Sequence, residues 1–216
     1  MERRSGLRER KKAETRQRIA DAAAHLFAER GFDDVSIAEV ARAADVSDQT
    51  VFNYFPGKHD LALDRAEAIR RRLHDLVTDR APGVTPAVAL RVVAVEDVER
   101  ARRTDLDEQR GQFFALCVSS PVVRRFGLEV RDQQVATIRE AILATDPALD
   151  PALAHVHAAA LVAVLQRVGD RIGRGVVDGA FPAAEADELL RAVQVALDDL
   201  DEHFRRWTGA AREDPP

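Results

Sequence analysis

Apolar side chains recur along most of this chain at spacings of three and four residues. This is the period of an amphipathic α-helix, and almost no segment alternates with period two for long. Only residues 91–95, Arg-Val-Val-Ala-Val, resemble a strand, and their surroundings are helical. The pattern predicts an all-α fold of about nine helices. We expect them at residues 12–30, 37–43, 48–55, 60–80, 86–103, 106–119, 121–144, 151–174 and 182–208.

Several of these helices carry recognisable ends. Gly31 stands in the position of a C-terminal stop for the first helix. Ser36 and Ser47 are good N-caps for the second and third helices, and Pro56 with Gly57 ends the third. Two short helices joined by the tight turn at residues 44–46, both leaning on a longer first helix, form a helix-turn-helix module of about fifty residues.

The third short helix divides its side chains between burial and contact. Val51 and Phe55 are four residues apart and point inward, with Val46 behind them. Gln49 and Asn53 project together on the other side. Gln and Asn pair well with adenine in the DNA major groove, and an aromatic ring can touch a thymine methyl group. The alternative is a merely solvated face of a small bundle. The polar and outward candidates are Ser47, Asp48, Gln49, Thr50, Phe52, Asn53 and Tyr54.

Charge is distributed unevenly along the chain. The formal net charge is -5, yet residues 1–20 hold eight basic and three acidic side chains, so the other 196 residues sum to -10. A basic arm therefore precedes an acidic body. The arm is either a solvated leader or a source of salt-sensitive affinity for DNA phosphates. The candidate phosphate contacts are Arg10, Lys11 and Lys12 in the arm, together with Ser36, Thr50, Tyr54 and Lys58.

Composition gives no support for an enzyme, a metal site or a cofactor. The single cysteine, Cys117, fits a reducing cytoplasm and cannot form a disulfide or a thiolate cluster within one chain. His155 and His157 are two residues apart and lie on different faces of a helix, which is wrong for joint metal ligation. We see no phosphate-cradling glycine loop, secretion signal or apolar run long enough to span a bilayer, and we expect a cytoplasmic protein without a membrane partner.

The segment GFDDVSIAEVARAADVSDQTVFNYFPGKHDL, residues 31–61, resembles the N-terminal domain of the tetracycline-repressor (TetR) family of bacterial regulators, as does the preceding AAAHLFAERGF. The resemblance covers about residues 10–62. It implies that Ser36, Thr50, Tyr54 and Lys58 hold phosphates. It also implies that Asp48, Gln49, Phe52 and Asn53 lie near bases of double-stranded DNA.

This chain departs from the family pattern at two positions. Phe52 replaces the usual Tyr and retains only an apolar contact, and Ala38 replaces a longer polar side chain, which puts a base contact from that position in doubt. Asp48 either accepts from a cytosine amino group or simply suits the positive end of its helix, and we favour the second interpretation.

The remainder of the chain resembles the family only in its helix pattern. We divide the chain into a DNA-binding domain at residues 1–62, an effector-binding and dimerisation domain at 63–208, and a tail at 209–216. In the family the last two helices pair with those of a second copy, although intrachain packing is the alternative for their apolar stripe. The predicted dimer residues are Leu189, Val193, Ala196, Leu200 and Phe204. Candidate pocket residues, for which plain core packing is the alternative, are Phe113, Phe114, Cys117, Val162 and Gln166.

Together these patterns and the family resemblance predict a homodimeric transcriptional regulator that binds a palindromic operator. We favour a repressor, and an activator is the open alternative. The resemblance of LRERKK and VSDQTVFNYFPGK to a subset of the family implies that a small apolar molecule, such as an acyl-CoA-like compound, would release it. Two other hypotheses are a helical adaptor that docks proteins on its third helix and an α-helical enzyme. The adaptor predicts no dependence on DNA sequence, and the enzyme predicts turnover.

Overall fold

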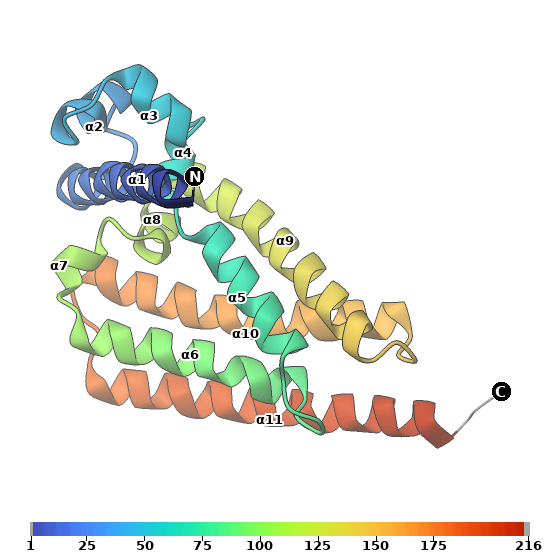
Figure 1. The fold of residues 1–216 in the computed structure, drawn as a ribbon. Coiled ribbons are helices and arrows are strands. Elements are labelled where there is room, and N and C mark those ends of the chain that lie inside the picture. Colours follow the sequence, from blue (N-terminus) through green and yellow to red (C-terminus); the bar gives the residue numbers. More distant parts are fainter. Residues whose placement is uncertain (1, 214–216) are drawn as a thin grey trace.

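The chain folds into eleven α-helices within residues 2–213, and the described residues contain no strand (Figure 1). The structure is a computed structural model that describes the backbone of residues 2–213 and the side chains of residues 8–209. The helices are α1 (Glu2–Arg30), α2 (Ile37–Ala43), α3 (Asp48–Tyr54), α4 (Lys58–Ala62), α5 (Ala66–Thr78), α6 (Pro86–Arg103), α7 (Leu106–Gln109), α8 (Phe113–Ser119), α9 (Pro121–Thr145), α10 (Pro151–Asp178) and α11 (Ala183–Glu213). The predicted all-α fold is confirmed.

The predicted caps are also confirmed. The hydroxyl oxygen of Ser36 accepts from the Glu39 N–H at the start of α2, and that of Ser47 accepts from the Thr50 N–H at the start of α3. The Asp150 side chain caps α10, with Pro151 in the first turn. Gly31 ends α1 with a φ of 82°, a conformation that glycine adopts without steric cost.

The prediction of nine helices was wrong because two of the expected helices are broken. Residues 60–80 form α4 and α5, separated at residues 63–65. The end of α4 is buried in the N-terminal core while α5 packs on α6 and α9, so the chain changes direction between them. Residues 106–119 form α7 and α8, separated at Arg110–Gln112, where Gly111 lies against α1.

Three helices are longer than predicted. Helix α1 begins at Glu2 rather than at Lys12, because the intervening residues are mostly good helix formers. Helix α10 continues to Asp178 and ends at Gly179. Helix α11 continues through Gly209 to Glu213, so most of the predicted tail is helical in the structure.

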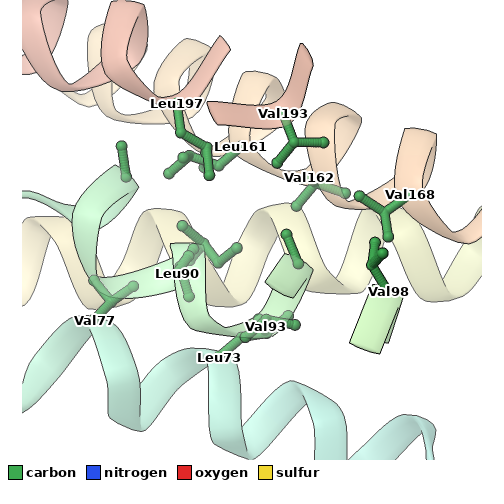
Figure 2. Packing of buried hydrophobic residues seen from close by; sticks show 14 of the residues in the cluster. Leu73, Val77, Leu90, Val93, Val98, Leu161, Val162, Val168, Val193 and Leu197 are labelled. Carbon is green, nitrogen blue, oxygen red and sulfur yellow. The ribbon is translucent and has the colours of Figure 1, made fainter. Parts of the chain in front are cut away.

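Two hydrophobic cores organise these helices. The N-terminal core joins α1 to α4 around Phe27, Val51 and Phe55, and it also receives Leu116 from α8 and Val123 from α9. The C-terminal core joins α5, α6, α10 and α11, with Leu73, Leu90, Leu161 and Leu197 directed toward one another (Figure 2). Helix α8 therefore contributes to both cores, since its Ala115 belongs to the C-terminal one.

Helix α10 is long and apolar enough to cross a membrane by length and composition alone, with a mean hydropathy of 1.3 over its best 18-residue window. The expectation that no such segment exists was therefore too strict. Residues along α10, including Leu161, Val162 and Ile172, are buried in the C-terminal core. We interpret α10 as the central core helix of this bundle.

Candidate nucleic-acid interface

Helix α3 is fixed to its support by two side chains with no exposed surface, Val51 and Phe55. Arg16 on α1 strengthens this attachment in three ways. Its guanidinium lies 4.2 Å from the centre of the Phe55 ring, donates to the Tyr54 carbonyl at 2.9 Å and pairs with Asp64 at 2.6 Å. Sequence reasoning missed Arg16, which looked like one more cation of the basic arm. The recognition candidate is thus held rigidly at its C-terminal end.

The turn between α2 and α3 requires an unusual backbone conformation. Asp45 has a φ of 52°, and among the described non-glycine residues it alone has a positive φ. The Val46 N–H donates to the Ala41 carbonyl at 3.0 Å, which closes the helix end in the manner of a Schellman motif. Left-handed backbone costs L-residues about 1–2 kcal/mol, and Asp tolerates it better than Ala does.

This geometry makes position 45 a test of turn strain. We expect the Asp45→Gly variant to be about 1 kcal/mol more stable to unfolding than Asp45→Ala, with the parent chain between them. Urea denaturation of the three proteins measures the order. Equal stability of the Gly and Ala variants would show that residue 45 does not hold the left-handed conformation in solution.

The outer face of α3 presents polar groups and one exposed ring. Gln49 Nε2 donates to Asn53 Oδ1 at 3.2 Å, so the two amides project together as predicted. Phe52, a large apolar residue, is 46% exposed on this face. The hydroxyl groups of Ser47 and Thr50 are 2.8 Å apart and share one hydrogen bond. This face has hydrogen-bonding amides beside an apolar contact surface.

Ser36 lies at the start of α2, but its hydroxyl group is already engaged. The hydroxyl donates to Glu39 at 2.7 Å while its oxygen accepts from the Glu39 backbone N–H. These Ser36 contacts, followed by a hydrogen bond from Arg30, lower the pKa of Glu39 to about 2. A phosphate at Ser36 would have to compete with a charged carboxylate for the same proton.

Lys58 is turned inward in the structure. Its ammonium donates to the Asp33 carbonyl at 3.1 Å and lies 4.4 Å from the centre of the Phe32 ring, and partial burial lowers its pKa. Exposed cations stand instead on the N-terminal half of α1, where Arg10, Lys11 and Lys12 precede Ile19, the first fully buried side chain among those described in that helix. The arm is therefore the more accessible positive surface beside the module.

Residues 19–64 match the family model of bacterial regulatory proteins of the tetR family. MftR of Mycobacterium tuberculosis is 42% identical over 50 residues, which are 23% of this chain and 25% of MftR. The HTH-type transcriptional regulator TcmR of Streptomyces glaucescens is 31% identical over 85 residues, which are 39% of this chain and 38% of TcmR. The matched stretches thus span between a quarter and two fifths of these curated relatives.

The whole fold has solved counterparts. NalD of Pseudomonas aeruginosa, the secondary repressor of the MexAB-OprM multidrug efflux pump, aligns with a TM-score of 0.56 at 20% identity. The alignment covers 85% of this chain and 97% of NalD. The N-terminal module, residues 19–64, thus matches the TetR family. The match supports the prediction of a transcriptional regulator.

The predicted pocket residues divide between the two cores of the chain. Phe113 and Cys117 pack on the N-terminal core, and burial, followed by the nearby Asp170, raises the pKa of the Cys117 thiol to about 12. Phe114 packs on the C-terminal core, to which the fully buried Val162 belongs. Gln166 donates to Asp170 at 2.8 Å. Three of the five residues thus lie on α8 and two on α10.

Phe114 fills the space between α8 and α10. A methyl group added at Gly169 would lie 2.6 Å from the Phe114 ring, and one added at Gly173 would lie 2.3 Å from the Phe114 carbonyl oxygen. A separate groove of about 580 Å³ lies beside α5 and has Arg71, Arg72 and Arg80 among its lining residues. All three arginines are already paired, Arg71 with Glu67, Arg72 with Glu96 and Arg80 with Asp146.

The predicted dimer stripe on α11 is mostly internal in the structure. Leu189, Val193 and Phe204 are buried in the chain's own core, while Ala196 and Leu200 are partly exposed. These three buried residues correspond to the intrachain alternative, so their assignment to a dimer surface was wrong. The periodicity located the apolar face of α11 correctly but could not identify its partner, which includes α6 and α10 of the same chain.

The histidines of α10 lie on different faces, as predicted. His155 is exposed, whereas His157 has no exposed surface and contacts the rings of Phe204 and Trp207. Neither ring nitrogen of His157 has a hydrogen-bond partner. Within the described residues, no group of three or more His, Cys, Asp or Glu side chains is placed to hold a metal ion.

Proposed function

We propose that this chain is a ligand-responsive transcriptional repressor that binds a palindromic operator as a homodimer. The observation that carries the proposal is the outer face of α3, where paired amides and an exposed ring stand on a rigidly supported helix of the family's DNA-binding module. Such a helix fits the major groove, and Gln49 and Asn53 offer donors and acceptors to adenine there. Phe52 supplies an apolar surface for a thymine methyl group.

Affinity would come largely from cations and hydroxyl groups around this face. Arg10, Lys11 and Lys12 are exposed on α1, so they can approach phosphates without rearrangement. Thr50 and Tyr54 lie on the same helix as the reading face. A role for Ser36 or Lys58 requires each to exchange an internal contact for a phosphate, as the site geometry indicates.

Dimerisation would place two copies of α3 on two half-sites of one operator. Helices α10 and α11 provide a surface for it on the side facing away from the core. Val156 is 55% exposed and Val195 is 69% exposed, and the small Ala163 is exposed near the middle of α10. We therefore move the proposed interface to this face, of which the partly exposed Ala196 and Leu200 form the edge.

A charge on this face should separate the copies. We expect Val195→Arg to weaken dimerisation by about tenfold or more, because a guanidinium would be buried without a partner. Sedimentation equilibrium over a range of concentrations measures the dissociation constant. Val122→Arg, at an exposed valine of α9 outside the proposed interface, is the matched control. Identical dissociation constants for the two variants would contradict the interface.

The effector site is proposed beside α8, among Phe113, Phe114, Cys117, Val162 and Gln166. The surroundings are mainly apolar, which favours a small apolar molecule, including one of acyl-CoA type. An apolar group that displaced the Phe114 ring would move α8, and α8 also contributes Leu116 to the core that supports α3. The same movement would then change the spacing of the two reading helices.

DNA binding is tested by mobility shift on duplexes from the promoter region beside the chain's own gene. Binding should weaken as salt rises, with a slope of log K against log salt of about -9 if roughly ten phosphates are neutralised per dimer. Asn53→Ala should cost about 1–3 kcal/mol on the operator and relax one position of it. Lys12→Ala, the control, should weaken operator and random duplex alike. The proposal fails if no duplex from that region is bound or if binding ignores salt.

A further inference from the structure

The N-terminal module contains an open cleft between α2 and α3, next to the reading face. It has a volume of about 510 Å³ and is lined by Ala38, Arg42, Asp45, Val46 and Asp48. Ala38 and Arg42 are four residues apart and share one face of α2, so the short alanine leaves room for the longer arginine beside it. The cleft thus combines one cation and two carboxylates at the base of the recognition helix.

Arg42 differs from two arginines that hold this module together. Arg16 and Arg30 are both engaged, the first with Asp64 and the second with Glu39. Arg42 is exposed and makes no ion pair or side-chain hydrogen bond with any other described side chain, although it lies at the same cleft as Asp45 and Asp48. Its donors are free for a partner outside the chain.

Asp48 is free as well. The cap of α3 is provided by Ser47, whose oxygen accepts from the Thr50 N–H at 3.1 Å, so the Asp48 carboxylate is not needed for that task. It is exposed and accepts no hydrogen bond from the described residues. Asp48 is also the first residue of α3, and the N-terminal residues of a recognition helix are those that meet base edges.

We propose that Arg42 and Asp48 together read one G·C base pair in each half-site. This inference rests on the proposed function. In the major groove a G·C pair presents the guanine O6 and N7 acceptors beside the cytosine N4 amino donor. Arg42 donates to the guanine, and Asp48 accepts from the cytosine. The donors of Arg42 and the acceptor of Asp48 at one cleft are therefore complementary to the acceptors and the donor of the G·C pair.

The carboxylates favour a base pair over a phosphate as the partner of Arg42. A phosphate held by Arg42 would lie near Asp45 and Asp48, both exposed and both at the same cleft, and like charges would repel it. The cytosine amino group has the opposite polarity and relieves this repulsion. If the base opposite Asp48 offers only an acceptor, two acceptors face each other. Asp48 therefore disfavours any sequence that places such a base at this position.

The test is selection from a randomised duplex library with the full chain and its variants, followed by sequencing of the bound DNA. We expect the parent to select a motif with one G·C position per half-site. Arg42→Gln and Asp48→Asn should each reduce the preference at that same position by about ten- to a hundredfold and leave the other positions unchanged. Asp45→Asn, at the same cleft, is the matched control and should retain the parent motif.

Several outcomes would overturn the inference. Relaxation of different positions by the two variants would assign them to separate contacts. A uniform loss for Arg42→Gln across all sequences would make it a phosphate contact, and an unchanged motif in both variants would place neither residue at a base. If the parent chain enriches no sequence, the proposed sequence-specific DNA binding is itself wrong, and this inference fails with it.

Discussion

Replacement of Gly111 by Ala should destabilise the chain by about 3 kcal/mol, because the added methyl group has no room. Its carbon would lie 1.8 Å from the carbonyl oxygen of Ala24 and 2.7 Å from the carbonyl carbon. Both atoms belong to the backbone of α1, so no rotation of a side chain can relieve the overlap. The connection between α7 and α8 would have to move away from α1. Denaturant unfolding at fixed protein concentration measures the loss.

Gly209→Ala is the matched control for this substitution. A methyl group at Gly209 meets no atom within 4 Å, and the residue lies in the last part of α11. Alanine is the better helix former by up to about 1 kcal/mol, so this variant should equal or exceed the parent in stability. If Gly111→Ala unfolds at the same denaturant concentration as Gly209→Ala, the close contact between α1 and the segment before α8 is absent in solution.

The contact of Gly111 with α1 is one reason why we propose the effector site beside α8. Its preceding loop touches α1 through Gly111, and its Phe114 backbone touches α10 at Gly173. The Ser120 hydroxyl, which caps α9 directly after α8, lies 3.3 Å from Asp33 Oδ1 in the connection between α1 and α2. Helix α8 therefore contacts both halves of the molecule, and a shift of this short helix would affect both cores.

Sequence pattern predicted the module around α3 well because its determinants are local. Caps at Ser36 and Ser47 and the inward pair Val51 and Phe55 depend on residues only a few positions apart, and each is found in the structure. The free state of Arg42 was not predictable. It depends on where the other charges of the module find partners, and this information is tertiary.

The sequence predicted helix boundaries and side-chain environments less well where a contact between residues far apart in the chain determines them. Gly111 looked tolerable inside a helical pattern from 106 to 119, yet its approach to α1 breaks that helix. The apolar stripe of α11 was located correctly, but periodicity does not say whether the partner is the same chain or another. Lys58 was expected to face outward, but its ammonium group is engaged by the Phe32 ring and the Asp33 carbonyl.

His157 should make the free energy of unfolding depend on pH at values above those at which carboxylates titrate. Burial, with smaller contributions from His203 and Arg80, lowers the pKa of His157 from 6.5 to about 4, while Asp201 opposes the shift. Between these values the unfolded chain binds a proton that the folded chain does not, so stability falls as pH decreases from about 6.5 to 4. The full loss is about 3 kcal/mol, because one pKa unit corresponds to about 1.4 kcal/mol.

Replacement of His157 by Leu should remove this loss. We expect the variant's free energy of unfolding between pH 6.5 and 4.5 to change by about 1.4 kcal/mol per pH unit less than that of the parent. Denaturant unfolding at several pH values and one protein concentration gives both slopes. His155→Leu, at an exposed site two residues away on the same helix, should retain the parent slope. Because the contacts of Phe204 and Trp207 with position 157 also change, the slope rather than the absolute stability decides the test. Parallel slopes for parent and His157→Leu would mean that His157 takes up its proton in the folded chain as readily as in the unfolded one.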